Sequence, residues 1–301
     1  MSALRDALRS DEFAVTAELS LSPQQTISEI MAAAAKFQNT VDAVQIPDHR
    51  NARPHISPVA IAAHMLTAGL DPIVRMNCRD RNRIAVQSEL LAARSFGISN
   101  LLLSRGTELP DDHRPRTTGV YDLTAIDLVR TAAAIRDGEA LTEKGNEDGT
   151  DFFIGTVATA FKPTDDWEPE KLLAKADAGA QFIQLQLCMD TDLLGSYAAH
   201  LVSSRLTWRF QVLANIAVLP SVEEARALRK SNPGSNIPAE LVRRIADARD
   251  AEMEGVKITA ETIQALQDIP GIAGVNLQAT ADPELLLAAI EQSGVKVRGS
   301  E

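Results

Sequence analysis

The sequence repeats one pattern eight times: a short apolar run is followed by a longer stretch in which apolar residues recur at helical spacing. The apolar runs cover residues 13–19, 41–46, 72–77, 100–103, 152–158, 182–187, 210–218 and 272–277. The helical stretches cover residues 23–37, 57–68, 81–96, 124–136, 168–178, 192–204, 222–230 and 283–292. Strands that alternate with helices pair in parallel through right-handed crossovers. We therefore predict an α/β fold, a (β/α)8 TIM barrel, with residues 1–301 as a single barrel domain.

A doubly wound open sheet is the alternative fold for this pattern, but no GxGxxG follows any of the predicted strands. The most polar stretch, residues 137–151, is expected to be a surface loop. A further helix is expected at residues 237–249, in the long connection after the seventh strand. Long loops of this kind often help to cover a ligand.

The charge composition argues against one class of binding partner, nucleic acids. The formal net charge is −11, so there is no general basic excess to neutralise phosphates, and we predict no nucleic-acid partner. This balance still allows a local basic pocket for a phosphorylated cofactor. A hydrophobic content of 45% is ample for a buried core.

Cysteines and histidines give no sign of a metal site. Cys78 and Cys188 do not have metal-ligand spacing, and the five histidines form no HxH or HExxH pattern. Residues 1–13 are of mixed charge without the apolar core of a signal peptide, and no apolar run reaches the roughly 18 residues of a membrane span. We expect a cytoplasmic protein without membrane contact, and a homo-oligomer is left open.

The first predicted strand ends in Thr16-Ala17-Glu18-Leu19-Ser20, which places a carboxyl directly after an apolar run. Polar side chains at the carboxyl ends of barrel strands are catalytic candidates by position. Burial there favours the protonated form that a general acid needs near neutral pH. The alternatives are a solvated glutamate and one in a salt bridge with a neighbouring strand.

The third predicted strand ends in the segment Asn77-Cys78-Arg79-Asp80-Arg81-Asn82-Arg83. A polar, basic segment at a strand–helix junction can hold an anionic ligand and begin the next helix. The alternative is that Asp80 is the N-cap and the arginines are solvated. Three arginines at a helix N-terminus oppose the helix dipole, which favours contacts with a ligand or an acidic partner.

Arg105-Gly106 follows the fourth predicted strand. A glycine lets a ligand approach the backbone beside the cationic side chain, so a phosphate or pyrophosphate contact is one interpretation. An ordinary turn glycine is the other.

Amide side chains share one face of each late strand. Gln184 and Gln186 lie two residues apart, as do Asn276 and Gln278, and Asn215 lies in the seventh strand. A buried amide without partners is costly, so a ligand or an interior hydrogen-bond network is expected. An amide-rich lining with one carboxylate suits a planar heterocycle. It suits a metal poorly and offers no nucleophile paired with a base.

Taken together, these segments resemble the methylenetetrahydrofolate reductase family, over a stretch from about Phe13 to Gly294. Ala17-Glu18-Leu19-Ser20 resembles the family's first-strand motif, Asn77 to Arg83 resembles its TCRDRNR segment, and Arg105-Gly106 resembles its RGD loop. Further likenesses are Asp48 with Ser57-Pro58 after the second strand, Val120-Tyr121-Asp122-Leu123 (VFDL), Lys175 to Ala180 (KxDAGA), and Gln186 with Asp190 (QxxxD). Their common order and spacing carry the resemblance.

The resemblance implies a flavin-dependent barrel of one-carbon metabolism with non-covalent FAD. NADH or NADPH would be the reductant, and 5,10-methylenetetrahydrofolate would be reduced to 5-methyltetrahydrofolate. The implied small-molecule partners are a tetrahydrofolate derivative and a nicotinamide nucleotide. The alternatives are the same chemistry run oxidatively and a flavin-free, folate-binding or accessory barrel.

The resemblance also implies roles for individual residues. Glu18 would be the acid that assists opening of the methylene bridge, and Gln186 would orient the reactants. Cofactor contacts are expected from Asn77, Arg79, Asp80, Arg105, Gly106, Thr107, Ala158 and Lys175. Substrate contacts are expected from Asp48, Glu108, Gln186, Asn215 and Gln278.

Two positions depart from the family pattern. Thr107 stands where the family has an aspartate after Arg-Gly, with Glu108 next to it. Asn77 stands where the family has a threonine. The first change alters the charge expected near a flavin and a pterin, and the fold prediction is unaffected.

Overall fold

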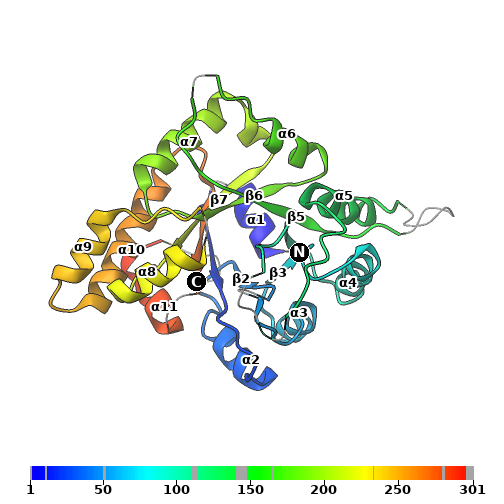
Figure 1. Cartoon of the computed structure of the whole chain (residues 1–301), viewed down its shortest axis with the longest axis horizontal. Coiled ribbons are helices and arrows are strands. Elements are labelled where there is room, and N and C mark those ends of the chain that lie inside the picture. The colour runs from blue at the N-terminus through cyan, green and yellow to red at the C-terminus, as the bar shows by residue number, and fades with distance from the viewer. Residues whose placement is uncertain are drawn as a thin grey trace.

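Eight parallel strands close into one barrel, in which each strand pairs with its sequence neighbours and β8 pairs with β1 (Figure 1). The computed structural model describes residues 2–10, 12–49, 52–109, 114, 116–139, 148–164, 166–232, 234–279 and 282–295. The strands are β1 (Ala14–Glu18), β2 (Ala43–Ile46), β3 (Pro72–Asn77), β4 (Asn100–Ser104), β5 (Phe153–Ala158), β6 (Phe182–Leu187), β7 (Gln211–Ala217) and β8 (Gly274–Gln278). The predicted (β/α)8 fold is confirmed, and no strand end lies more than two residues from its predicted place.

Helices surround the barrel, and two of them begin with the sequence signal that predicts a helix start. Thr26 with Glu29 and Thr124 with Asp127 form capping boxes, in which each side chain bonds the other residue's backbone N–H. The helices that pack around the strands are α2 (Ile27–Ala35), α3 (Pro58–Thr67), α4 (Arg83–Ser95), α5 (Ala125–Arg136), α6 (Glu170–Asp177), α7 (Thr191–Ser203), α10 (Ala251–Gln267) and α11 (Pro283–Ser293). Within the described residues, no helix has the length and apolarity that a membrane crossing needs. The polar loop expected at 137–151 falls largely outside the described residues.

The connection between β7 and β8 differs from the expectation. The predicted helix at 222–230 is α8 (Val222–Ser231), which packs on α9 (Ala239–Asp247), the helix predicted at 237–249. The helix that packs against β7, β8 and α11 is α10, which was not predicted. Part of its buried face carries no apolar side chain: Gly255 lies against the Leu219 carbonyl, and Thr259 donates to the Ala217 carbonyl at 3.2 Å. Small and hydroxyl residues on that face weaken the apolar periodicity by which a buried helix is recognised.

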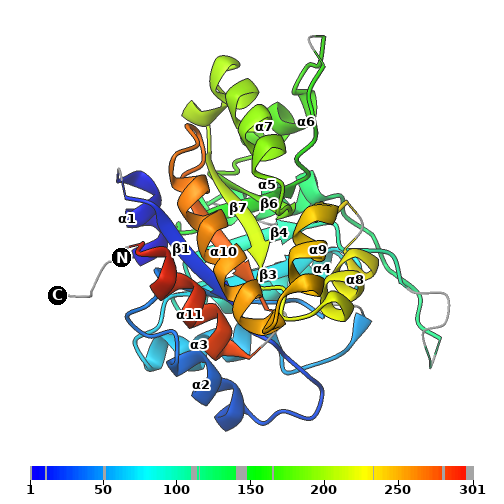
Figure 2. The ribbon, with the colours of Figure 1, turned by 90° about the vertical axis from the view of Figure 1, so that its left-hand side faces the viewer.

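A short helix that was also not predicted, α1 (Ala3–Arg9), closes the amino-terminal end of the barrel. Figure 2 shows α1 at one end of the barrel and the α8–α9 pair at the other. Leu4 and Leu8 are buried in one cluster with Phe153 of β5. Ser2, the N-cap of α1, donates a hydrogen bond of 2.6 Å to Asn100 of β4. The mixed-charge start of the chain therefore belongs to the barrel core.

We expect Leu4→Ala to lower the free energy of unfolding by about 2–5 kcal/mol, because Leu4 is fully buried and truncation leaves a cavity. Urea denaturation measures the change. Leu173→Ala is the matched control, because Leu173 is 37% exposed on α6. Equal effects of the two substitutions would contradict the role of α1 in the core.

Candidate active site

The barrel lumen changes from apolar to polar along the strands. The side chains nearest α1 are Ala14, Ala43, Ile73, Leu102, Phe153, Phe182 and Leu213. Further along the strands, the inward-facing positions are occupied by Glu18, Gln45, Arg75, Gln184, Asn215, Asn276 and Gln278. The polar half therefore lies toward the carboxyl ends of the strands, where enzymes of this architecture carry their sites.

Glu18 is buried in this polar half, with 2% of its surface exposed. Its Oε2 accepts hydrogen bonds from Gln45 Nε2 at 2.7 Å and from Arg75 Nη1 at 3.2 Å. Of the alternatives that the sequence left open, the solvated glutamate is wrong. A salt bridge exists alongside burial, but it joins Glu18 to Arg75 on β3, the strand beyond the neighbouring β2. The carboxyl is thus held by β2 and β3 at the end of β1.

Neither partner of Glu18 was predicted from the sequence. Gln45 lies in register with Glu18 on the adjacent strand, and its alternation with the apolar Val44 and Ile46 was an available signal. Arg75 interrupts the apolar strand Pro72–Asn77 and lies two residues before Asn77, on the same face. A charged residue inside a parallel barrel strand is unusual enough to have singled out this position.

A chain of hydrogen bonds links the amides of β7 and β8 to β1. Thr16 Oγ1 donates to Asn276 Oδ1 at 2.9 Å, and Asn276 Nδ2 donates to Asn215 Oδ1 at 2.8 Å. Asn215 Nδ2 in turn donates to Gln278 Oε1 at 3.2 Å. An interior network, one of the two expectations for the amides, therefore accounts for Asn215 and Asn276.

Three buried amide atoms are left without a partner. Gln45 Oε1, Gln184 Oε1 and Gln278 Nε2 have no hydrogen bond within the described residues. Each of these side chains is at most 4% exposed. An unsatisfied buried polar atom costs on the order of 1–3 kcal/mol, so three in one lumen indicate that a ligand or water supplies the missing partners. Two acceptors and one donor are the complement of a planar heterocycle with N–H and carbonyl groups.

Asp48, a predicted substrate contact, is tied to the protein on both carboxylate oxygens. Arg81 binds it with two hydrogen bonds, of 2.8 and 2.9 Å, and the Asn77 backbone N–H donates to Oδ2 at 2.8 Å. The Asn77 side-chain amide also donates to Oδ2. The structure thus brings Asp48 and Asn77 together, and their hydrogen bonds join the ends of β2 and β3.

The structure corrects the alternative in which Asp80 caps the helix after β3. The N-cap of α4 is Asn82, which accepts from the Ala85 N–H, so the assignment of Asp80 as N-cap is wrong. Asp80 instead pairs with Arg79 through two hydrogen bonds of 2.7 Å. Burial opposes ionisation of Asp80, but the hydrogen bonds and charge of Arg79 hold its pKa below the ordinary value. Two of the three arginines therefore have acidic partners inside the chain.

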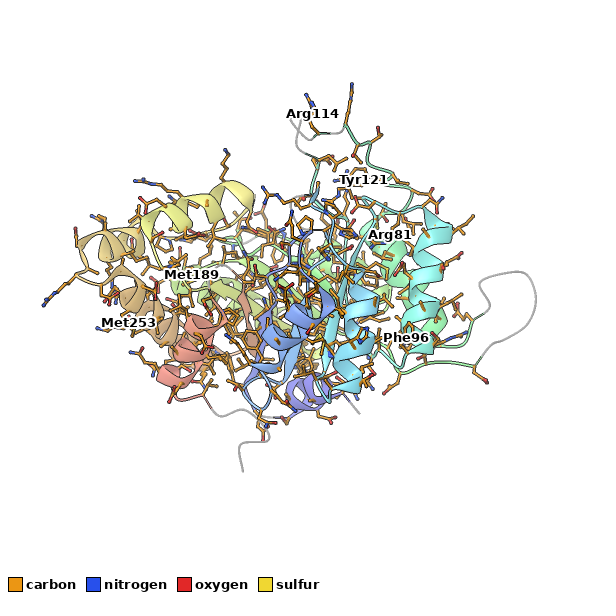
Figure 3. The ribbon with its side chains drawn as sticks, turned by 90° about the horizontal axis from the view of Figure 1, so that it is seen from below. Arg81, Phe96, Arg114, Tyr121, Met189 and Met253 are labelled. Carbon is orange, nitrogen blue, oxygen red and sulfur yellow. The ribbon has the colours of Figure 1, made fainter. Side chains whose placement is uncertain are left out.

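The loop after β4 lies on the rim beside this segment. Gly106 has a φ of +87°, and a Cβ there would approach the Arg79 and Asn77 side chains to 3.0 and 3.2 Å. The loop returns over β3, where the Tyr121 N–H donates to the Cys78 carbonyl. Figure 3 shows Tyr121 and Arg81 toward the side from which Arg114 projects. The neighbouring side chains therefore require glycine at position 106 on steric grounds, in addition to the requirement of the turn.

The side chains of this loop face solvent. Arg105 pairs with Glu108 at 2.6 Å and lies over the Tyr121 ring, 4.2 Å from its centroid. The hydrogen bond from Arg105 lowers the pKa of Glu108. Thr107 is exposed, and its backbone carbonyl accepts from the Tyr121 hydroxyl. An exposed cation over an aromatic ring offers a surface for an anionic or planar group.

Lys175 on α6 lies at the end of β5 and has no acidic partner within the described residues. Its Nζ donates to the Val157 carbonyl at 2.5 Å, one residue before Ala158. Burial, with a smaller contribution from the charge of Lys171, lowers the pKa of Lys175. A half-buried ammonium without a counter-ion is a suitable partner for an anion.

Gln186 lies under the connection between α8 and α9. A Cβ at Gly234 would lie 3.4 Å from Gln186 Oε1, and the Asn236 N–H donates to the Leu187 carbonyl at 2.9 Å. Within the described residues, the Gln186 side chain makes no hydrogen bond, whereas Asp190, its partner in the QxxxD pattern, is the N-cap of α7. The long connection after β7 reaches the end of β6, and its covering of a ligand stays a prediction.

The fold and these contacts define a barrel with a buried acid in its lumen and basic groups on its rim. A family model described as methylenetetrahydrofolate reductase matches residues 3–294. The chain therefore belongs to the methylenetetrahydrofolate reductase family. No curated protein matches it in sequence at a significant level.

Solved structures share the barrel at low sequence identity. An uncharacterized protein from Clostridium thermocellum, which binds two copies of 5-methyl-5,6,7,8-tetrahydrofolic acid, has a TM-score of 0.70 and 12% identity, with 97% of this chain and 99% of that chain covered. A 2,3-dimethylmalate lyase of the PEP mutase/isocitrate lyase superfamily has a TM-score of 0.51 and 14% identity, with 100% and 88% covered. An oxaloacetate acetylhydrolase has a TM-score of 0.50 and 16% identity, with 99% and 86% covered. At these identities the likeness shows the fold.

We expect Gly106→Ala to destabilise the protein by more than the roughly 1–2 kcal/mol of a left-handed non-glycine residue, because the added methyl also meets Arg79 and Asn77. Gly69→Ala is the matched control: its φ is +77°, and a Cβ there meets nothing within 4 Å. Thermal unfolding compares the two variants. Equal losses would show that the rim imposes no steric demand on Gly106.

His49, beside Asp48, predicts a pH dependence of stability. Burial lowers the pKa of His49, and the Arg81 cation adds to this against the opposing charge of Asp48. The unfolded chain therefore binds a proton at His49 more readily, and the free energy of unfolding falls as pH drops from about 6.5 through the folded pKa.

We expect His49→Asn to reduce this loss, because the substitution removes the titrating ring and asparagine tolerates the left-handed φ of +45° at this position. Urea denaturation at about pH 7 and about pH 5.5 measures the difference. His64→Asn, on the exposed face of α3, is the control and should leave the pH dependence unchanged. The same pH dependence in wild type and His49→Asn would refute the assignment.

Proposed function

We propose that this chain, with residues 1–301 as one catalytic domain, is a flavin-dependent methylenetetrahydrofolate reductase. It would use NADH or NADPH, through bound FAD, to reduce 5,10-methylenetetrahydrofolate to 5-methyltetrahydrofolate. The observation that carries the proposal is the buried carboxyl of Glu18 in a lumen with three unsatisfied amide atoms. Family membership supports the reaction class. The C. thermocellum protein, which binds the product that we propose here, supports the substrate class.

The residues present are suited to such a cofactor. Lys175 and Arg105 provide cations for its phosphates, and the approach of Gly106 to Asn77 and Arg79 keeps the rim backbone open. When bound, FAD would supply the hydride chemistry, and the protein would supply orientation and electrostatics.

The lumen side chains would act on the substrate. Glu18 would deliver the proton that opens the methylene bridge, because it is the one acidic side chain that the strands turn inward. Gln186, with an unused amide under the α8–α9 connection, would orient the heterocycle. Gln184 and Gln278 would provide the acceptor and donor that the interior network leaves over.

A flavin-free, folate-binding barrel is the second candidate, and Thr107 favours it. Its exposed hydroxyl stands where the family has a carboxylate near the flavin. The visible spectrum of the purified protein separates the two candidates. Flavin bands in the blue and near ultraviolet support the reductase. A colourless protein that fails to bind added FAD supports the second candidate. With flavin bound, steady-state rates for each substrate pair determine the direction.

We expect Glu18→Gln to keep bound flavin and its reduction by NAD(P)H, but to lose folate turnover by roughly 10²–10⁴-fold, which is the contribution of a general acid. Anaerobic stopped-flow absorbance follows the two half-reactions separately. Glu252→Gln is the control, because Glu252 is exposed on α10, away from the strand ends. Normal folate turnover in Glu18→Gln would overturn the proposed role of Glu18.

A further inference from the structure

The inward-facing side chains of the barrel form layers, and alternate strands supply the members of each layer. By the strand register, one polar layer comes from β2, β4, β6 and β8, and the next layer toward the carboxyl ends comes from β1, β3, β5 and β7. The first contains Gln45, Leu102, Gln184 and Asn276, and the second contains Glu18, Arg75, Val157 and Asn215. Because β2 and β6 are opposite each other in the closed sheet, Gln45 and Gln184 lie on opposite walls of their layer.

Gln184 is a buried amide without a hydrogen-bond partner. It is 2% exposed, its Oε1 has no partner, and its side chain makes no hydrogen bond within the described residues. Asn276 in the same layer differs, because it accepts from Thr16 and donates to Asn215. Replacing an unpartnered amide by an apolar side chain of the same shape is neutral or stabilising. The amide of Gln184 therefore contributes nothing to the folding of the ligand-free chain, and its reason lies in what it binds.

Gln45 supplies a second acceptor on the opposite wall. Its Nε2 donates to Glu18 Oε2 at 2.7 Å, and this bond fixes the amide so that Oε1 is the atom left without a partner. The side chain of Gln45 is fully buried. Two amide oxygens on opposite walls of one layer complement a group that donates two diverging N–H bonds.

The layer above Gln184 is open to an entering ligand. Val157, in register with Gln184 on the adjacent strand, is partly exposed, and the side chain of Arg75 is 28% exposed. Across the eight strand pairs, all within the described residues, the one shift of register lies between Gln184 and Leu187, where β6 pairs with β7. β-bulges of this kind are common next to active sites, where they re-aim a side chain. A ligand that enters at the carboxyl ends therefore meets Val157 first and Gln184 next.

We propose that Gln184 and Gln45 are paired acceptors for an exocyclic amino group, so that the amino-bearing edge of the substrate heterocycle points down the lumen. This inference rests on the proposed function and adds to it the orientation of the substrate and the group that is recognised. The amino-substituted pyrimidine ring of a tetrahydrofolate has such an edge. The pyrimidine edge of a flavin has carbonyl oxygens on both sides of its N–H, and these would face the two amide oxygens acceptor to acceptor. The layer therefore selects the pterin over the flavin.

The first test compares stability without ligand. Gln184→Met keeps the length of the side chain and removes the unpartnered amide, so we expect the melting temperature of the ligand-free full chain to rise by roughly 2 °C or more. Asn276→Leu is the control from the same layer and should lower the melting temperature, because it removes two satisfied hydrogen bonds. A fall in Gln184→Met comparable to that in Asn276→Leu would show that the amide has a partner in the folded chain, and it overturns the inference.

The second test measures recognition of the amino group. Isothermal titration calorimetry compares 5-methyltetrahydrofolate with its analogue in which hydrogen replaces the amino group, each titrated into the full chain as purified. Wild type should bind the analogue roughly ten-fold or more weakly. Gln184→Met should bind the parent ligand more weakly and lose most of this discrimination, which a purely structural role would not change. Gln292→Met, on the exposed face of α11, is the matched control and should discriminate as wild type does.

The outcomes separate this inference from the proposed function. Equal affinity of wild type for the two ligands, as expected if a water molecule occupies the space between the amide oxygens, overturns the inference and leaves the proposed function standing. Unchanged discrimination in Gln184→Met has the same consequence. Failure of wild type to bind either ligand, with or without added FAD, overturns the proposed function and, with it, the inference.

Discussion

Closure of the sheet is the constraint on which everything else in this protein depends. Because β8 pairs with β1, every strand is hydrogen-bonded on both sides and no edge remains. Alternate side chains must then point into a lumen that is largely closed to water. The character of every second residue therefore decides what each level of the barrel can do, and a single polar residue at an inward position has consequences that it would not have in an open sheet.

The two ends of the lumen are specialised in opposite ways. At the amino-terminal end, Leu4 and Leu8 of α1 close an apolar floor, so that end contributes stability. At the carboxyl-terminal end, the rim loops are fixed by the Arg81–Asp48 pair and by backbone hydrogen bonds from the segment around Tyr121. The apolar residues at one end and the hydrogen-bonded loops at the other hold the polar side chains between them in place. A catalytic or binding site requires such fixed side chains.

The sequence predicted the strands better than the helices, and the reason is physical. A buried barrel strand is a short apolar run, so all eight strands could be located from the positions of such runs in the sequence. The ring helix α10 could not, because Gly255 and Thr259 build part of its buried face, and α1 could not, because its seven residues carry only two leucines among charges. Glu18 could be found from its position alone. The pairing of Glu18 with Arg75 could not be predicted. It depends on the stagger of the strands, which brings a β3 side chain past β2 to β1, and this stagger follows from barrel geometry and not from any local sequence pattern.

The candidate ligand-binding residues fall into two groups: those whose polar atoms already have hydrogen-bond partners in the chain, and those with unused donors. Both carboxylate oxygens of Asp48 accept hydrogen bonds from Arg81, and Nε and Nη2 of Arg79 donate to Asp80 and to the His49 carbonyl, so a ligand would have to displace a charged hydrogen bond to bind these atoms. Within the described residues, Lys175 at the end of β5 and Arg75 in the lumen each make one side-chain hydrogen bond, which leaves donors unused. A ligand gains a charge-assisted hydrogen bond there at little cost to the protein. By this argument, Arg79 and Arg81 hold the rim through Asp80 and Asp48, and the contact of Arg79 with a cofactor stays a prediction. Recognition would then rest on the lumen amides and on the cations of Arg75, Arg105 and Lys175.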